Sequence, residues 1–391
     1  MRSDDSTPPG PLDRWYEQAG VRTGVRRMFH EDAERGKVLF PAALVPYATH
    51  EAVRALPPER IRELTVRHLY QFLLSTTHLE TRVVNAAAEP VANGRAGLDL
   101  PAALRLDAFK VYCDEGYHAL YSLDLAGQIA AVTGIAVPGW DYGGFVERLR
   151  ETGRAQLPQA PRLAELLQAV VFETLITAVL NEVPADETVA APVRDLLRDH
   201  ARDEGRHHRF FSLFFKELWV RLTPAEQADA ARALPALIRA ALTWDLGPVH
   251  ASLRLAGLDA DTARQVVADT YADGPGERRL NEMARALLRL CAATGVFELP
   301  GIRAHFAAHG LGDGSGTGPI GDGSGAVYLG DGSGTGRAGD GSGTGRAGDG
   351  SGTGRAGDGS GTGRAAGPIG DRYGAGHLDD DGSGAGPLER S

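Results

Sequence analysis

Residues 203–207 read Asp-Glu-Gly-Arg-His, and the same pattern, D-E-G-x-H, occurs about 89 residues earlier at residues 114–118. Both copies lie in long segments rich in alanine, leucine and arginine, whose apolar residues recur with the period of a helix. In each copy a glutamate and a histidine are three residues apart, so both side chains lie on one helix face. Carboxylate and imidazole groups are ligands for first-row transition metals. The repeated pattern therefore predicts two metal-binding helices.

The second copy is extended by a further histidine on the same helix face. His200, Glu204 and His207 stand at positions i, i+4 and i+7, within an arc of about 60°. Four phenylalanines follow directly within residues 210–215, which indicates that this helix is buried rather than solvent-exposed. We therefore expect all three side chains to face the interior.

Two other glutamates lie in separate helical segments. Glu173 is the only charged residue between Leu166 and Leu180, and an isolated buried carboxylate costs on the order of several kcal/mol unless it is paired, protonated or metal-bound. Glu80 lies in an earlier helix. Two Glu-x-x-His motifs plus one glutamate from each of two other helices form the di-iron site of ferritin-like bundles. The predicted metal ligands, in chain order, are Glu80, Glu115, His118, Glu173, Glu204 and His207.

The aspartate of each copy has a supporting role in this interpretation. A ligating histidine usually donates its second N–H to a carboxylate. Asp114 and Asp203 could each reach the histidine of the opposite helix, although surface charge is the alternative. The four glutamates carry the charge that balances two ferrous ions, so the reduced site could be buried as a neutral unit.

The fold class predicted from these patterns is all-α, a ferritin-like bundle of long helices around a buried di-iron site. Four of the predicted helices exceed 24 residues. We expect an N-terminal extension with a short helix at 1–45, a helical domain at 46–309 and a separate tail at 310–391. The predicted helices span residues 59–92, 101–134, 159–183, 187–221, 224–243 and 276–296.

The tail repeats Gly-Asp-Gly-Ser-Gly-Thr-Gly-Arg-Ala with a period of nine residues, and 31 of the 51 glycines follow position 309. This composition predicts a disordered, solvated segment, because it cannot bury enough apolar surface to offset ordering entropy. A calcium-binding β-roll is the alternative, but most repeats lack the large apolar residue that such a fold needs.

Composition excludes several other classes. The net charge of -10 gives no support to nucleic-acid binding. Two cysteines, Cys113 and Cys291, are too few for a disulfide framework, a cysteine-ligated zinc site or an iron–sulfur cluster. We find no secretory signal and no apolar run long enough to span a membrane, and expect a cytoplasmic protein.

The ligand pattern resembles that of the p-aminobenzoate N-oxygenase family of di-iron oxygenases, over about residues 55–300. That family carries a third histidine, His-x-x-x-Glu-x-x-His, in its last metal-binding helix. Residues 200–207 match this motif, so the resemblance implies that His200 is a seventh ligand. Glu80, Glu115, His118 and Glu173 match the family's remaining ligands in order and approximate spacing.

The resemblance also implies an activity. Two iron ions would activate O2 and oxidise an amine, such as an aminobenzoate-type arylamine, to a hydroxylamine and a nitro product in natural-product biosynthesis. Electrons would come from an external reductase or ferredoxin, because the chain has no flavin or nicotinamide fingerprint and no iron–sulfur cysteines. A homodimer is compatible with the sequence. A di-iron C–H hydroxylase or desaturase, ferritin-like iron oxidation and storage, and a metal-free interaction module remain alternatives.

Overall fold

The computed structural model describes residues 10–175, 178–243, 245–272 and 277–314. The described residues are mostly helical, and their only β-type pairing is an isolated bridge between Val38 and Val189. The helices and helical turns are α1 (Trp15–Gln18), α2 (Gly20–Thr23), η1 (Ala42–Leu44), η2 (Pro46–Thr49), α3 (Glu51–Arg54), α4 (Pro58–Leu79), η3 (Glu80–Val84), α5 (Asn85–Ala92), α6 (Ala102–Thr133), α7 (Gly144–Gln156), α8 (Pro161–Thr174), α9 (Ala178–Glu182), η4 (Val183–Ala185), α10 (Ala191–Trp219), α11 (Pro224–Ala241), α12 (Gly247–Leu255), α13 (Ala260–Tyr271), α14 (Glu277–Met283), α15 (Arg285–Ala293), η5 (Val296–Glu298) and α16 (Ile302–Ala308).

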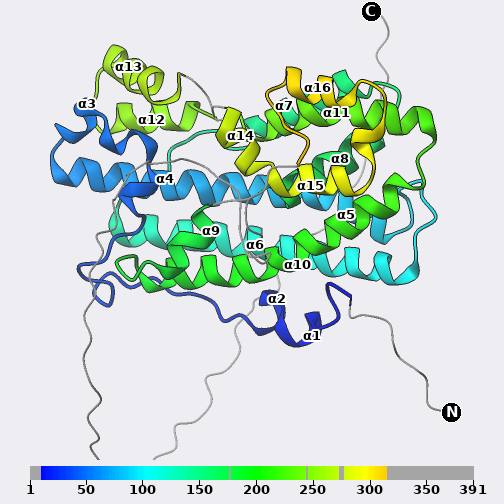
Figure 1. Cartoon of the computed structure of the whole chain (residues 1–391). Coiled ribbons are helices and arrows are strands. Elements are labelled where there is room, and N and C mark those ends of the chain that lie inside the picture. Colours follow the sequence, from blue (N-terminus) through cyan, green and yellow to red (C-terminus); the bar gives the residue numbers. More distant parts are fainter. Residues whose placement is uncertain (1–9, 176–177, 244, 273–276, 315–391) are drawn as a thin grey trace, which may run out of the picture. The chain divides into compact units, whose positions relative to one another are not determined.

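The all-α bundle predicted from the sequence is confirmed. Elements α4, η3 and α5 follow one another without interruption and form the first long helical stretch, and α6, α8 and α10 supply the next three bundle helices. Helix α6 packs against α4, α5 and α10, while α8 packs against α10 and α11. In Figure 1, α4, α6 and α10 run side by side across the molecule.

Two of the predicted long helices differ from the structure. The segment predicted as one helix at 159–183 ends at Thr174, because Leu175 adopts an extended conformation, and α8 has 14 residues. The Thr174 hydroxyl donates to the carbonyls of Val170 and Val171 in this last turn of α8. The predicted helix at 276–296 divides into α14 and α15. By contrast, α6 and α10 have 32 and 29 residues.

Two large apolar clusters and a third, small one fill the described interior, and the two large ones lie toward opposite ends of the long helices. Along α6, Val111 belongs to the first cluster and Leu125 to the second; along α10, Phe210 belongs to the first and Leu197 to the second. Each fully buried side chain of this size contributes about 1.5–3 kcal/mol of stability. The residues of the D-E-G-x-H motifs lie between these positions on both helices. The bundle therefore holds a buried polar layer between two apolar regions that stabilise it.

The N-terminal part of the chain contacts the bundle. Within the predicted extension at 1–45, helix α2 packs against α6 and α10. At the other end, the described residues stop at Gly314, so almost all of the predicted tail, with its calcium-binding alternative, lies outside the described residues.

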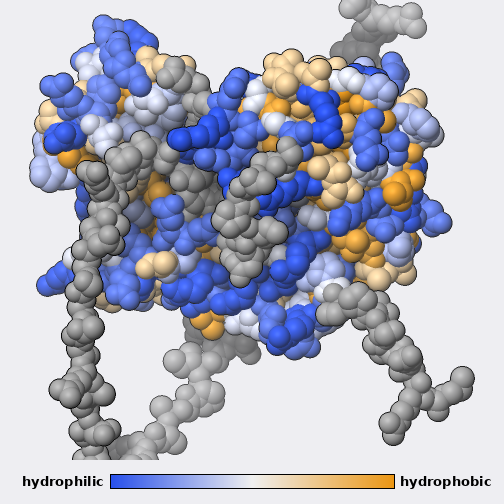
Figure 2. Space-filling view, in the orientation of Figure 1, coloured by the Kyte–Doolittle hydropathy of each residue, from blue (hydrophilic) through white to orange (hydrophobic). Residues whose placement is uncertain are grey.

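The described surface is mixed in character. On the face shown in Figure 2, hydrophilic side chains predominate and apolar side chains are scattered among them. Among the described helices, none combines the length and the apolar character that a membrane crossing requires.

Candidate metal centre

The structure brings all seven predicted ligand side chains together in the polar layer. They form three overlapping groups, and within each group the candidate donor atoms lie within 4.8 Å of one another. The groups share members, so they form one continuous centre rather than three separate ones. The groups are Glu80, His118, His200 and Glu204; Glu115, His118, Glu204 and His207; and Glu80, Glu115 and Glu173.

Glu80 reaches the centre from η3, a π-helical turn within an otherwise α-helical stretch. The N–H of Asn85 donates to the carbonyl of Glu80, five residues earlier, so the turn holds one residue more than an α-helical turn. Such π turns are frequent at functional sites. The side chain of Glu80 is buried and its Oε1 lies 3.3 Å from Nε2 of His200. No sequence signal marked this turn.

Helix α6 supplies the most deeply buried pair. Glu115 and His118 are fully buried, and Nδ1 of His118 lies 2.9 Å from Oε2 of Glu115. The same nitrogen is 3.5 Å from Oε1 of Glu204 on α10. The three-residue spacing of the motif thus places both side chains on the face of α6 that meets α10.

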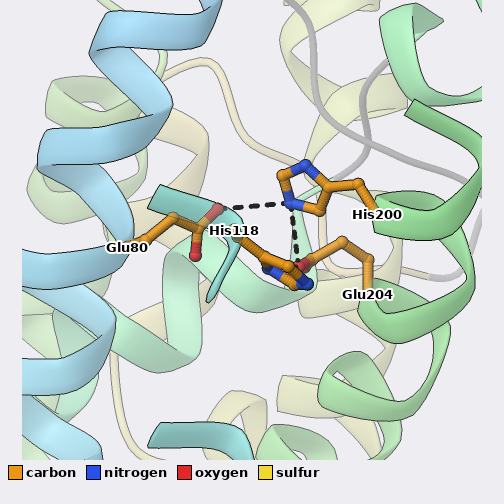
Figure 3. Close-up of side chains that lie close together, drawn as sticks. All are labelled: Glu80, His118, His200 and Glu204. Carbon is orange, nitrogen blue, oxygen red and sulfur yellow. Dashed lines mark ion pairs between the residues drawn. The ribbon is translucent and has the colours of Figure 1, made fainter. Parts of the chain in front are cut away.

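Helix α10 contributes the largest share of the centre. Nε2 of His200 lies 3.2 Å from Oε1 of Glu204, and Nδ1 of His207 lies 3.3 Å from the same oxygen. His207 Nδ1 is also 2.9 Å from Oε1 of Glu115. Figure 3 shows Glu80, His118, His200 and Glu204 pointing toward one another, with His200 and Glu204 both on α10. One oxygen of Glu204 therefore lies close to nitrogens of all three histidines.

The two aspartates contact the histidines of the opposite helices. Nε2 of His118 lies 3.3 Å from Oδ2 of Asp203, and Nε2 of His207 lies 3.1 Å from Oδ2 of Asp114. In both histidines Nδ1 faces the centre while Nε2 faces an aspartate. These are the reciprocal contacts considered from the sequence; their role in supporting metal ligands stays a prediction.

Burial and the close approach of several carboxylates shift the pKa values of the groups in the centre. Burial and the neighbouring Glu115 raise the pKa of Glu80 well above its usual value, and burial and Glu204 do the same to the pKa of Glu173. For Glu204, burial and Glu115 oppose ionisation, but the adjacent histidines outweigh them and lower its pKa to about 2. Burial opposes protonation of His207, yet Glu115 and Glu204 outweigh it and raise the pKa of His207.

Several buried polar atoms of the centre lack a hydrogen bond from the described residues. Buried polar atoms in native proteins are normally paired, and a bound cation would satisfy all of these lone pairs together. Four carboxylates and three imidazoles form a donor set that suits iron and other first-row metals. The atoms include Glu80 Oε2, Glu115 Oε1, Glu173 Oε2, Glu204 Oε1 and His207 Nδ1.

Sequence reasoning missed some neighbours of the centre. The indole of Trp15 and the backbone N–H of Gly20 bind the two aspartates, and Arg206 forms an ion pair with Asp203. Tyr121 packs against the rings of His118 and His200. Trp15 and Gly20 are about a hundred residues or more from their partners, and no local pattern links them.

Two further histidines of these helical stretches, His78 and His208, lie outside the three groups. His78 contacts Arg82, four residues later on the same stretch. His208 is more closely connected, because its Nδ1 lies 3.1 Å from the backbone carbonyl oxygen of Glu173. His208 on α10 therefore contacts α8 at the backbone of Glu173, a predicted ligand.

A helical bundle with a buried centre of carboxylates and histidines is the arrangement of ferritin-like metal oxidoreductases. The family described as p-aminobenzoate N-oxygenase AurF matches residues 28–295, well over half of the chain. The chain belongs to this family, as its resemblance predicted. No curated protein matches the sequence. All seven predicted ligands and both aspartates lie within the matched residues.

Proposed function

We propose that the protein is a di-iron oxygenase that uses O2 to oxidise the nitrogen of an arylamine. The observation that carries the proposal is the buried centre of four glutamates and three histidines in a chain of the p-aminobenzoate N-oxygenase family. Two bound iron ions would supply the chemistry of O2 reduction and amine oxidation. The substrate class, an aminobenzoate-type arylamine, rests on the name of the family.

The distribution of side chains supports two metal positions. Glu80 and His200 lie on one side of the centre, and Glu115 and His207 on the other, with His118 and Glu204 in both four-residue groups. Glu173 joins the centre through its proximity to Glu80 and Glu115. Four carboxylates neutralise two divalent ions, which lowers the cost of burying the charges.

The remaining residues shield the centre along the helices and hold the ligands, and Glu204, with a side chain that is 22% exposed, is its most accessible member. The two apolar clusters close the centre on both sides along the helices, and this low-dielectric surrounding strengthens its electrostatic interactions. Asp114 and Asp203 accept hydrogen bonds from the outer nitrogens of His207 and His118 and keep their inner nitrogens directed at the centre.

The overall reaction needs two electrons from outside the chain. Oxidation of an amine to a hydroxylamine by O2 consumes two electrons and two protons and releases one water. An external reductase or ferredoxin is the expected donor, and natural-product biosynthesis is the setting in which such nitro and hydroxylamino products are used. His200 favours this function over iron storage, because a third nitrogen ligand is more typical of O2 chemistry than of transient iron binding.

The test begins with metal content. Protein loaded anaerobically with Fe(II) should hold two irons per chain, and addition of O2, a reductant and a panel of arylamines should yield hydroxylamine or nitro products detectable by mass spectrometry. One metal per chain, or zinc without oxidase activity after iron loading, would contradict the di-iron site. Two irons with oxidation confined to C–H bonds, or to iron itself, would contradict N-oxygenation.

A further inference from the structure

Both aspartates of the centre are bound by one short segment near the N-terminus, residues 12–23, which we call the N-terminal strap. We propose that the strap is a working part of the metal centre, in which Trp15 and the backbone of Gly20 position Asp114 and Asp203, and through them the two inner histidines. The inference rests on the proposed metal site. The strap precedes residue 28, where the family match begins, so family membership does not explain it.

The first half of the arrangement joins Trp15 to His207. The indole N–H of Trp15 lies 2.9 Å from each carboxylate oxygen of Asp114, which is fully buried. Oδ2 of the same carboxylate lies 3.1 Å from Nε2 of His207. An indole can only donate and an ionised carboxylate can only accept, so His207 must carry its proton on Nε2. Its other nitrogen, Nδ1, then faces the centre, 2.9 Å from Oε1 of Glu115.

The second half joins Gly20 to His118. The backbone N–H of Gly20 lies 3.1 Å from Oδ2 of Asp203, and that oxygen is 3.3 Å from Nε2 of His118. Asp203 is 1% exposed, so its carboxylate is bonded by protein donors such as this N–H rather than by solvent. A Cβ atom at Gly20 would stand 2.7 Å from Oδ2 of Asp203, closer than side chains approach in proteins. Glycine is therefore required here by close packing.

The strap is itself fixed to the bundle. Leu12 and Ala19 are fully buried in the first apolar cluster. The buried Lys110 on α6 donates to the backbone carbonyl of Leu12 at 3.1 Å and pairs with Asp107 at 2.8 Å. These contacts hold Trp15 and Gly20 against the carboxylates of Asp114 on α6 and Asp203 on α10, so both donors are preorganised.

The experiment compares metal binding by Trp15→Phe and Gly20→Ala with that of the full-length wild-type chain, using Co(II) as a visible probe. Trp15→Phe keeps an aromatic ring but removes the N–H donor, and Trp140→Phe makes the same change at a tryptophan that is 43% exposed. Loss of the carboxylate that holds a metal-ligating histidine typically weakens metal binding by about 10–100-fold. Trp15 and Gly20 act through that carboxylate, so we expect Co(II) binding that is weaker by up to about tenfold and an altered Co(II) absorption spectrum in both strap variants, and neither change in Trp140→Phe.

The outcomes separate the strap from the proposed function. If wild-type protein binds two Co(II) and Trp15→Phe binds them with the same affinity and spectrum, the strap inference is wrong and the metal site stands. If the strap variants lower only the melting temperature of metal-free protein, with the Co(II) spectrum unchanged, the strap is merely structural and the inference is again wrong. Wild-type protein that binds no metal overturns both proposals. Should Gly20→Ala fail to fold, Trp15→Phe alone decides the question.

Discussion

Replacing Glu173 by glutamine should change stability in opposite directions with and without metal. Glu173 is 8% exposed, and it shares a group of donor atoms within 4.8 Å with Glu80 and Glu115. Two like charges at this distance repel by about 3.5 kcal/mol at an effective dielectric constant of about 20. Burial and Glu204 raise the pKa of Glu173, and partial protonation relieves some of this repulsion.

Glutamine keeps the shape of the side chain, removes the charge and adds an N–H donor facing carboxylates. In metal-free protein we therefore expect Glu173→Gln to raise the free energy of unfolding by about 1–3 kcal/mol. In the wild type, metal at a concentration 100-fold above its dissociation constant should add about 2.7 kcal/mol. For a domain of about 300 residues that corresponds to a rise in melting temperature of roughly 4–5 °C. The variant should lose most of this rise, because a charged ligand is missing.

The assay is thermal unfolding of both proteins in chelator and in excess Co(II). Glu165→Gln, on the same helix but with a side chain 46% exposed, is the matched control and should shift neither midpoint appreciably. The reasoning is refuted if Glu173→Gln destabilises the metal-free protein, or if Co(II) raises the melting temperature of variant and wild type equally. Either result would mean that Glu173 is held by ordinary packing rather than by a metal.

Three further predictions concern other parts of the chain. His200→Ala should leave a folded protein that keeps most of its iron but oxidises amines poorly, while the exposed His30→Ala retains activity; equal turnover in the two variants would remove His200 from the ligand set. Truncation after residue 314 should leave iron content and melting temperature unchanged. The cut is placed there because an earlier one would remove the buried Leu311. A large drop in iron content or melting temperature after this cut would show that the tail contributes to the fold. Thr223→Ala should cost about 1 kcal/mol in urea unfolding by removing the N-cap of α11, with metal binding unchanged; a parallel loss of metal would contradict a purely local role.

The helices and the membership of the centre could be predicted because both depend on local spacing. A lone charge in an apolar helix, such as Glu173, is costly to bury and so indicates a buried partner. Residues three, four or seven apart share a helix face whatever the tertiary fold, which is why His200, Glu204 and His207 meet in the structure. Their function as metal ligands stays a prediction until metal is measured.

Other features depend on contacts that no local pattern encodes. The π turn at Glu80 and the end of α8 at Thr174 occur inside segments whose composition favours an uninterrupted helix. His208 lies one position beyond the ligand face of its helix, and that position does not reveal its contact with the carbonyl of Glu173. For that reason His208→Ala would be a poor control for His200→Ala, and an exposed histidine serves better.

The repeated D-E-G-x-H motif acquires its meaning only when the two copies are considered together. Each copy places its glutamate and histidine in the centre, but its aspartate supports the histidine of the other copy: Asp203 contacts His118, and Asp114 contacts His207. A shift of α6 relative to α10 would therefore disturb both histidines at once. The strap binds both aspartates and so resists the same movement. We therefore expect a substitution at either aspartate to affect the whole centre. The losses of metal-binding free energy in Asp114→Asn and Asp203→Asn should then not add up in the double variant Asp114→Asn/Asp203→Asn, and this non-additivity would identify the reciprocal arrangement.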